Sequence, residues 1–179
     1  MQDYVITTDS NSDVLPGFIK ENDLTVIPQY YAFGDTVYGD ELNMEPHEFY
    51  ETMRNGDLPK SMANNPAVIS ERFGKILKEG KNILHIAFSS ALSGSCNNVV
   101  MTANELMAAY PDRRIVVFDS LNASLGEGVS VYRAVELWKE GKTMDEVYDV
   151  LMEEREHVNV SFTVNDLNHL QRGGRVSKT

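Results

Sequence analysis

The sequence has a single cysteine, four histidines and far fewer basic than acidic residues. One thiol, Cys96, cannot form a disulfide within the chain, so a reducing cytoplasm is the expected compartment. No CxxC or HxxxH spacing occurs, and a zinc site is therefore not predicted. The 16 Lys and Arg against 27 Asp and Glu give a net charge of −11, which argues against a nucleic-acid-binding surface.

Long apolar runs are missing as well. No run approaches the ~20 apolar residues that a membrane span needs, and the first residues lack the basic and apolar regions of a secretory signal. With 42% hydrophobic and 24% charged residues, the composition is ordinary for a globular protein, and 179 residues suffice for one domain with a sizeable core. We therefore expect a cytoplasmic globular protein without a membrane span.

The most informative stretch is Ile83–Val100. An apolar run, Ile83–Phe88, is typical of a buried strand, and the small hydroxyl-rich loop Ser89–Ser95 then leads into a long helix. A strand that enters a helix through such a loop directs unpaired N–H groups and the positive end of the helix dipole at one point, which suits a carboxylate or phosphate. The same pattern is also typical of an ordinary capped strand–helix turn, and that interpretation stays open.

Strand-like runs alternate with helical patterns along the whole chain. Strands are expected at 4–8, 24–33, 83–88, 115–118 and 158–164, with a loop at 57–66. This alternation predicts an α/β fold with a mostly parallel sheet and helices on both faces. Ligands of such sheets bind at the carboxyl ends of the strands. The polar loops expected there are Thr8–Asp13, Phe88–Ser95 and Asp119–Gly128.

Ser93, Gly94 and Ser95 are the main binding candidates. Gly94 lets the backbone approach a ligand closely, and either serine can cap the helix and donate to an anion. Ser93 as a catalytic nucleophile would need a base, and the surrounding sequence is neither a G-x-S-x-G elbow nor a P-loop. His85 lies inside the preceding strand, where a packed or surface histidine is expected.

Near the end of the chain, Arg172 and Arg175 flank two glycines. A guanidinium there can bind a carboxylate with two parallel hydrogen bonds. A solvated basic turn is the alternative.

Several blocks occur in one characteristic order. They are Thr8-Asp9-Ser10, Pro59-Lys60-Ser61, Ser89 to Ser95 (SSALSGS), Asp119-Ser120 followed by Ser124 and Gly126, and Arg172 to Ser177 (RGGRVS). Together they resemble the DegV family of bacterial fatty-acid-binding proteins over nearly the whole chain. The S-S-x-L-S-G-[ST] and R-G-G-R-[IV]-S blocks carry the resemblance, and Met62 departs from the small polar residue usual in the family.

The resemblance implies a protein that holds one long-chain fatty acid in a tunnel. It further implies a carrier subunit without catalytic residues, metal or cofactor, which presents the acid to a separate fatty acid kinase for phosphorylation to an acyl phosphate, a step of phospholipid metabolism. Ser93 matches the family's head-group serine, Ser61 stands where a threonine is usual, and Arg175 matches the arginine that ends the R-G-G-R block. With the serine loop, the expected ligand-binding set is Ser61, Ser93, Gly94, Ser95 and Arg175.

DegV proteins continue beyond the R-G-G-R block into a second domain that helps to enclose the ligand. We therefore expect residues 1–164 to form a DegV-like N-terminal α/β domain and residues 165–179 to begin the connection to a second domain that is largely absent from this chain. Two other functions stay open on the residues alone. One is a serine-dependent lipid hydrolase or acyltransferase using Ser93, and the other is a plain α/β interaction module.

Overall fold

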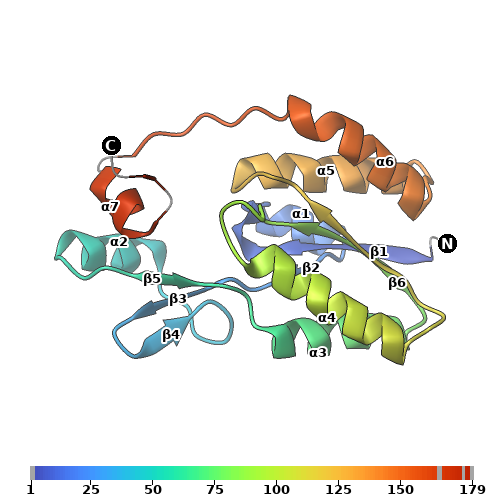
Figure 1. Cartoon of the computed structure of the whole chain (residues 1–179), viewed down its shortest axis with the longest axis horizontal. Helices are drawn as coiled ribbons and strands as arrows, with labels where there is room; N and C mark the ends of the chain where they lie inside the picture. Colours follow the sequence, from blue (N-terminus) through green and yellow to red (C-terminus); the bar gives the residue numbers. More distant parts are fainter. Residues whose placement is uncertain (1–2, 165–166, 175, 178–179) are drawn as a thin grey trace.

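The computed structural model describes residues 3–164, 167–174 and 176–177, and it contains two separate sheets (Figure 1). Within these residues, no helix combines the length and apolarity needed to cross a membrane.

The larger sheet is entirely parallel, with strand order β2-β1-β6-β7. Its strands are β1 (Tyr4–Asp9), β2 (Thr25–Ile27), β6 (Asn82–Ala87) and β7 (Ile115–Asp119). β1 pairs with β6 from Tyr4 opposite Asn82 to Thr8 opposite Ile86. Because the strands are parallel, their carboxyl ends lie along one edge of the sheet.

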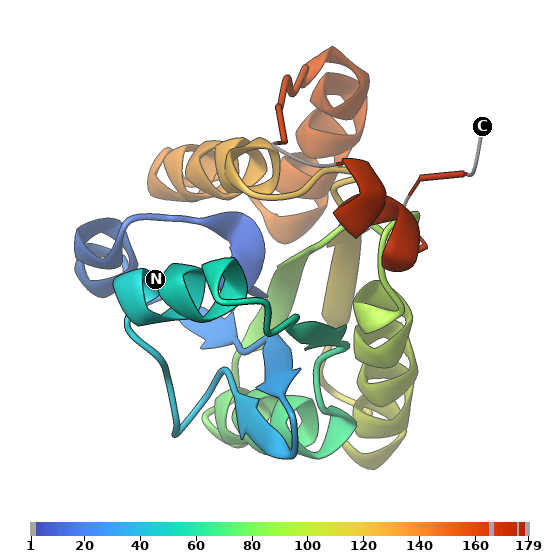
Figure 2. The same ribbon diagram turned by 90° about the vertical axis from the view of Figure 1, so that its left-hand side faces the viewer.

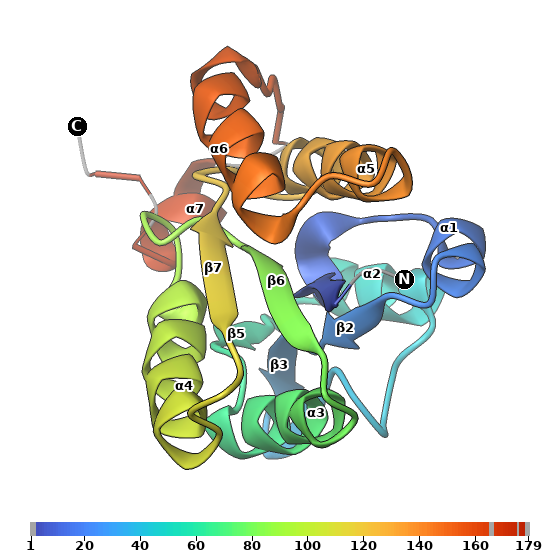
Figure 3. The same ribbon diagram turned by 90° about the vertical axis from the view of Figure 1, so that its right-hand side faces the viewer.

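Helices cover both faces of this sheet, as Figure 3 shows. Those on one face are α5 (Leu125–Lys139) and α6 (Met144–Glu154), and those on the other are α3 (Pro66–Lys78) and α4 (Ser95–Ala109). Neighbouring strand residues point to opposite faces, so Leu84 packs in the α5–α6 core while Ile83 packs in the α3–α4 core. The predicted α/β class, with helices on both faces of a mostly parallel sheet, is confirmed.

A short helix lies beside α5. This helix, α1 (Pro16–Glu21), begins at a proline, a favoured first helical residue, and places the Phe18 ring 4.3 Å from the Tyr132 ring of α5. It follows a single 3₁₀ turn, η1 (Ser10–Ser12), directly after β1.

The smaller sheet is antiparallel, with strand order β4-β3-β5. Its strands are β3 (Tyr30–Phe33), β4 (Thr36–Tyr38) and β5 (Lys60–Met62), and helix α2 (Pro46–Arg54) lies against it. The Phe49 ring of α2 lies 5.1 Å from Tyr31 and 5.5 Å from Phe33. The prediction of a loop over 57–66 is wrong at β5, because the pairing of that strand depends on β3 and its three exposed residues carry no alternating pattern.

The predicted last strand, 158–164, is also wrong. The segment is extended but belongs to neither sheet, and Figure 1 shows it running from the turn η2 (Arg155–His157) after α6 to helix α7 (Leu167–Arg172). Its alternation of apolar and polar residues is typical of a strand. A strand also needs a neighbour with which to form hydrogen bonds, and no strand in the described part of the chain lies beside it. Phe162 is consequently 78% exposed.

Candidate functional site

The three polar loops predicted to meet at the carboxyl edge of the parallel sheet do meet there. The Asp9 carboxylate at the end of β1 accepts a hydrogen bond from the Phe88 N–H (2.8 Å), and the Asn64 side-chain amide lies 3.4 Å from it. Asp119 at the end of β7 accepts from the N–H groups of Ser90 and Leu121, at 3.1 Å each. Two acidic side chains therefore hold the serine loop after β6 in place.

Ser93, Gly94 and Ser95 lie together where α4 begins. The helix starts at Ser95 with Gly94 as its N-cap, and the Ser95 N–H donates to the Ser93 hydroxyl oxygen (3.1 Å). Ser93 therefore satisfies the first helical N–H although it stands one position before the cap. Ser93 is half-buried and Gly94 is exposed, so this end of the helix is open to solvent. Binding of an anion by these residues stays a prediction.

Ser95 is fully buried and is the centre of a hydrogen-bond cluster. Its hydroxyl donates to the Gln29 side-chain oxygen (2.8 Å), accepts from the Asn64 backbone N–H (3.2 Å) and lies 3.0 Å from the Ser93 hydroxyl. Sequence reasoning missed Gln29 and Asn64. Both belong to segments without a motif, and only the fold brings them to the start of α4.

Ser61 lies in β5 and not in a loop as predicted. It is exposed and pairs with Tyr31 of β3. Among the described residues, no hydrogen bond joins Ser61 to Ser93 or Ser95. The connection runs along the chain instead, because β5 leads within three residues to Asn64, which contacts Ser95.

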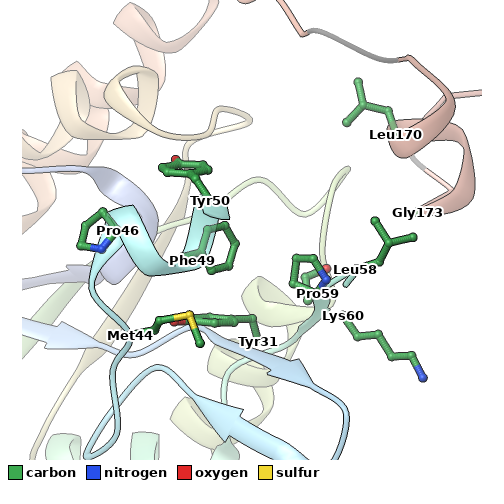
Figure 4. Close-up of a pocket in the computed structure, with 11 residues that line it drawn as sticks. Tyr31, Met44, Pro46, Phe49, Tyr50, Leu58, Pro59, Lys60, Leu170 and Gly173 are labelled. Carbon is green, nitrogen blue, oxygen red and sulfur yellow. The ribbon is translucent and has the colours of Figure 1, made fainter. Parts of the chain in front are cut away.

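Ser61 lines the wall of a cavity of about 870 Å³. The other lining residues are mostly apolar: Tyr31, Met44, Pro46, Phe49, Tyr50, Leu58, Pro59, Lys60, Leu170 and Gly173. In Figure 4, the Tyr31, Phe49 and Tyr50 rings face Leu58 and Leu170 across the space, and the Lys60 side chain points away from the rings. The cavity therefore has a mainly apolar interior, with Ser61 as a polar residue on its wall.

Helix α7 contributes Leu170 and the turn after it contributes Gly173 to this cavity. The predicted binding residue Arg175 lies outside the described residues, so its place relative to the cavity stays a prediction.

Buried acidic and imidazole groups lie beneath the loops. His85 is fully buried, with Nδ1 2.9 Å from the Thr7 hydroxyl and Nε2 3.7 Å from Asp9, which confirms the interpretation of a packed histidine. Burial, and then the nearby Asp9 charge, raise the pKa of Glu127 to about 9. Burial likewise raises the pKa of the Cys96 thiol to about 11, so this thiol is protonated at neutral pH.

Neither a nucleophile–base pair nor a metal site emerges from this geometry. Across the described residues, Ser95 is the one hydrogen-bond partner of the Ser93 hydroxyl. The same part of the chain contains no group of three or more His, Cys, Asp or Glu side chains arranged to hold a metal ion.

Comparison with known proteins gives consistent matches. The sequence profile of the DegV family of uncharacterised proteins matches residues 3–179. A DegV domain-containing protein of Clostridium perfringens is 38% identical over 181 residues, which cover all of this chain and 62% of the relative. This chain thus spans less than two thirds of the length of the curated relatives it matches.

Solved structures agree. A DegV family protein from Thermus thermophilus, described by its fatty acid binding, superimposes with a TM-score of 0.85 at 29% identity and covers 97% of this chain and 61% of its own. A Thermotoga maritima protein, described as revealing a fatty acid binding function, gives a TM-score of 0.75 at 29% identity over 87% of this chain and 56% of its own. The chain described here therefore belongs to the DegV family.

Proposed function

We propose that this chain binds a long-chain fatty acid, with the tail in the cavity beside α2 and the carboxylate at the serine loop that begins α4. The observation that carries the proposal is the cavity of about 870 Å³ with mostly apolar walls, on which Ser61 of β5 lies. The chain after β5 leads to Asn64, whose N–H donates to the Ser95 hydroxyl. The fatty acid binding described for the Thermus thermophilus and Thermotoga maritima proteins supports the proposal.

The tail supplies most of the binding free energy in this proposal. Each CH₂ group that leaves water contributes about 0.8 kcal/mol, so a long acyl chain against the rings of Tyr31, Phe49 and Tyr50 binds without any polar contact along its length. The cavity walls come from both sheet and helix, and rigid aromatic walls lose little conformational entropy when a chain enters.

The head group is oriented by hydroxyls and by the start of α4. Ser61, Ser93 and the Gly94 backbone supply short polar groups, the buried Ser95 acts through its hydrogen bond to the Ser93 hydroxyl, and Arg175 supplies the positive charge in this proposal. A hydrogen bond to a charged group contributes about 1.5–3 kcal/mol, and the amino end of a 15-residue helix adds a favourable dipole.

We further propose that the chain acts as a carrier subunit and presents the bound acid to a separate fatty acid kinase. The open side of the site supports this, since Ser90, Leu92 and Gly94 are exposed at the loop that would hold the carboxylate. A kinase could reach the acid there, and the carrier itself needs no cofactor for binding. The alternative of a serine-dependent hydrolase is not supported by any contact of Ser93, whose hydrogen bonds go to Ser95.

The test is lipid binding by the purified protein, both as this chain and in its longest natural form. Native mass spectrometry is expected to show a co-purifying fatty acid, and calorimetry is expected to show binding of added oleate. Ser93→Ala should weaken oleate binding by about ten- to a hundred-fold while leaving the fold intact, because one hydrogen bond to the carboxylate is lost.

Ser70→Ala is the matched control, because Ser70 is an exposed serine on α3. It should bind oleate like the unaltered protein. If the longest natural form carries no co-purifying lipid and does not bind added oleate, the proposed function is wrong. If Ser93→Ala binds oleate with unchanged affinity, Ser93 is not part of the head-group site.

A further inference from the structure

Gln29 lies behind the two serines at the start of α4, and its backbone is fixed on both sides. Its N–H donates to the Ser10 hydroxyl (2.9 Å). Its carbonyl oxygen packs against Gly39 so closely that a Cβ at position 39 would lie 2.2 Å from it. The side chain then reaches the Ser95 hydroxyl with its oxygen, while its Nε2 is buried without a hydrogen-bond partner among the described residues.

Counting hydrogens fixes the direction of each bond in this cluster. The Ser95 hydroxyl has one hydrogen, and this hydrogen goes to the Gln29 oxygen, which can only accept. The contact of 3.0 Å between Ser95 and Ser93 must therefore be donated by Ser93. Ser93 also accepts the Ser95 N–H, so its hydroxyl retains one lone pair and no free hydrogen.

A half-turn of the Gln29 amide reverses this chain of bonds. Nε2 then donates to the Ser95 hydroxyl, which already accepts from the Asn64 N–H, so both Ser95 lone pairs are occupied. The Ser95 hydrogen turns to Ser93 instead, and the Ser93 hydrogen becomes free to point outward. In each arrangement one amide atom of Gln29 has no partner within the cluster, so neither arrangement is favoured by the number of hydrogen bonds alone.

We propose that Gln29 is a positioning residue whose amide orientation decides whether Ser93 offers a lone pair or a hydrogen to the head group. This inference rests on the proposed function. A carboxylate accepts hydrogen bonds only, so its binding selects the reversed arrangement. An alcohol head group can donate to Ser93 and is accommodated by the arrangement of the free protein. Gln29 thereby tunes the site between acid and alcohol.

The direct readout is the side-chain amide signal of Gln29 in ¹H–¹⁵N spectra. Oleate should shift one of its Nε2 protons downfield and slow its exchange with water, because that proton gains a hydrogen bond to Ser95. Oleyl alcohol should change neither property. A purely structural role of Gln29 would not distinguish the two ligands, and an amide signal that oleate leaves unchanged overturns the proposal.

Variants give a second readout. In Gln29→Glu at neutral pH, the new carboxylate can only accept, so the Ser95 hydroxyl continues to donate its hydrogen to residue 29. Oleate affinity should then fall by about tenfold, while the affinity for oleyl alcohol should not change. Gln29→Met leaves the Ser95 hydrogen free and should bind oleate within a few-fold of the unaltered protein. A merely structural Gln29 would lose affinity for both ligands in both variants, which contradicts the proposal.

Asn97→Asp controls for charge, because it adds a carboxylate to an exposed position in the first turn of α4. It should weaken oleate binding clearly less than Gln29→Glu. An equal loss would assign the effect to repulsion and overturn the inference. If the unaltered protein binds no oleate at all, the proposed function fails instead, so the two failures are distinguishable.

Discussion

At the scale of single residues, the buried acids below the loops are the most consequential feature. Glu127 lies in the first turn of α5, is fully buried and accepts a hydrogen bond from the Thr8 hydroxyl (3.1 Å). A helix start and a hydroxyl donor both favour a charged carboxylate, but burial and the neighbouring Asp9 outweigh them and raise the pKa to about 9. At neutral pH, Glu127 therefore carries a proton in the folded protein.

This raised pKa predicts a dependence of stability on pH. The folded protein keeps the Glu127 proton between the ordinary value of 4.5 and about 9, where the unfolded chain has lost it. The contribution of Glu127 to the free energy of unfolding is fully present below the pKa of the unfolded chain, 4.5. As the pH rises from there to about 9, the free energy of unfolding should fall by up to ~1.4 kcal/mol per pH unit. Glu127→Gln should flatten this slope in urea unfolding measured from pH 5 to 9. The matched change at exposed Glu105 should leave the slope in place, and equal slopes in all three proteins would contradict the assignment.

Residue by residue, the site divides into a predictable and an unpredictable part. Ser93, Gly94 and Ser95 could be singled out because a strand, a small-residue loop and a helix follow one another within a single stretch. Gln29 and Asn64 could not, because a glutamine after a proline and an asparagine in a polar loop have no local pattern that indicates a contact. Their place beside Ser95 depends on the packing of distant segments.

At the scale of elements, the start of α5 fits closely against the turn after β1. A Cβ at Gly128 would lie 2.6 Å from the Ser12 carbonyl oxygen, a backbone atom that cannot move without shifting η1. A Cβ at Gly126 would lie 2.3 Å from a methyl group of Val160. The two glycines thus let α5 approach both the first polar loop and the extended segment before α7.

Gly128→Ala is therefore expected to destabilise the protein by about 1–3 kcal/mol, because η1 or α5 must shift. Gly74→Ala, in the middle of α3, is the matched comparison. A Cβ there meets nothing within 4 Å, and the higher helix propensity of alanine should stabilise the protein by about 0.5–1 kcal/mol. Chemical denaturation of both variants measures the two effects, and similar stabilities would show that the close approach at Gly128 is relaxed in solution.

The sequence predicts an element correctly when the residues of that element carry all the signals that define it. Thr143 and Glu146 form a capping box at the start of α6, and α1 and α2 begin at prolines, Pro16 and Pro46, so these helix starts are marked by their own residues. The errors, β5 and 158–164, both concern extended segments. A helix satisfies its own hydrogen bonds, whereas a strand is defined by its neighbour, so the assignment of an isolated extended segment requires the tertiary fold.

At the scale of the whole molecule, the cavity is assembled from parts far apart in the chain. Tyr31 comes from β3, Phe49 from α2 and Leu170 from α7. Figure 2 turns this end of the molecule toward the viewer and shows α2, the small sheet and α7 on the same side. The candidate tail site therefore lies beside the parallel sheet, and the candidate head-group site lies at its carboxyl edge.

A substitution at Leu170 tests whether α7 forms part of the cavity wall. Leu170→Ser should lower oleate affinity by about tenfold, equivalent to ~1.4 kcal/mol, because an apolar side chain is removed from the cavity wall. Leu167, on the same helix, is the control because it is 64% exposed and does not line the cavity. Leu167→Ser should leave the oleate affinity unchanged. Calorimetric titration with oleate compares the two, and equal losses would exclude a specific role for α7 in the wall.

The sequence by itself determined the α/β class, the parallel strands β1, β6 and β7 and the serine loop, because hydrophobic periodicity and loop composition act locally. It also indicated the DegV family, through short sequence blocks that occur in the family's order along the chain. Only the tertiary structure decided which residues surround Ser95, that β5 joins the small sheet, and that Tyr31, Phe49 and Leu170 line one cavity. Each of these depends on contacts between segments that are distant in sequence, and such contacts form only when the apolar faces of the sheets and helices pack together.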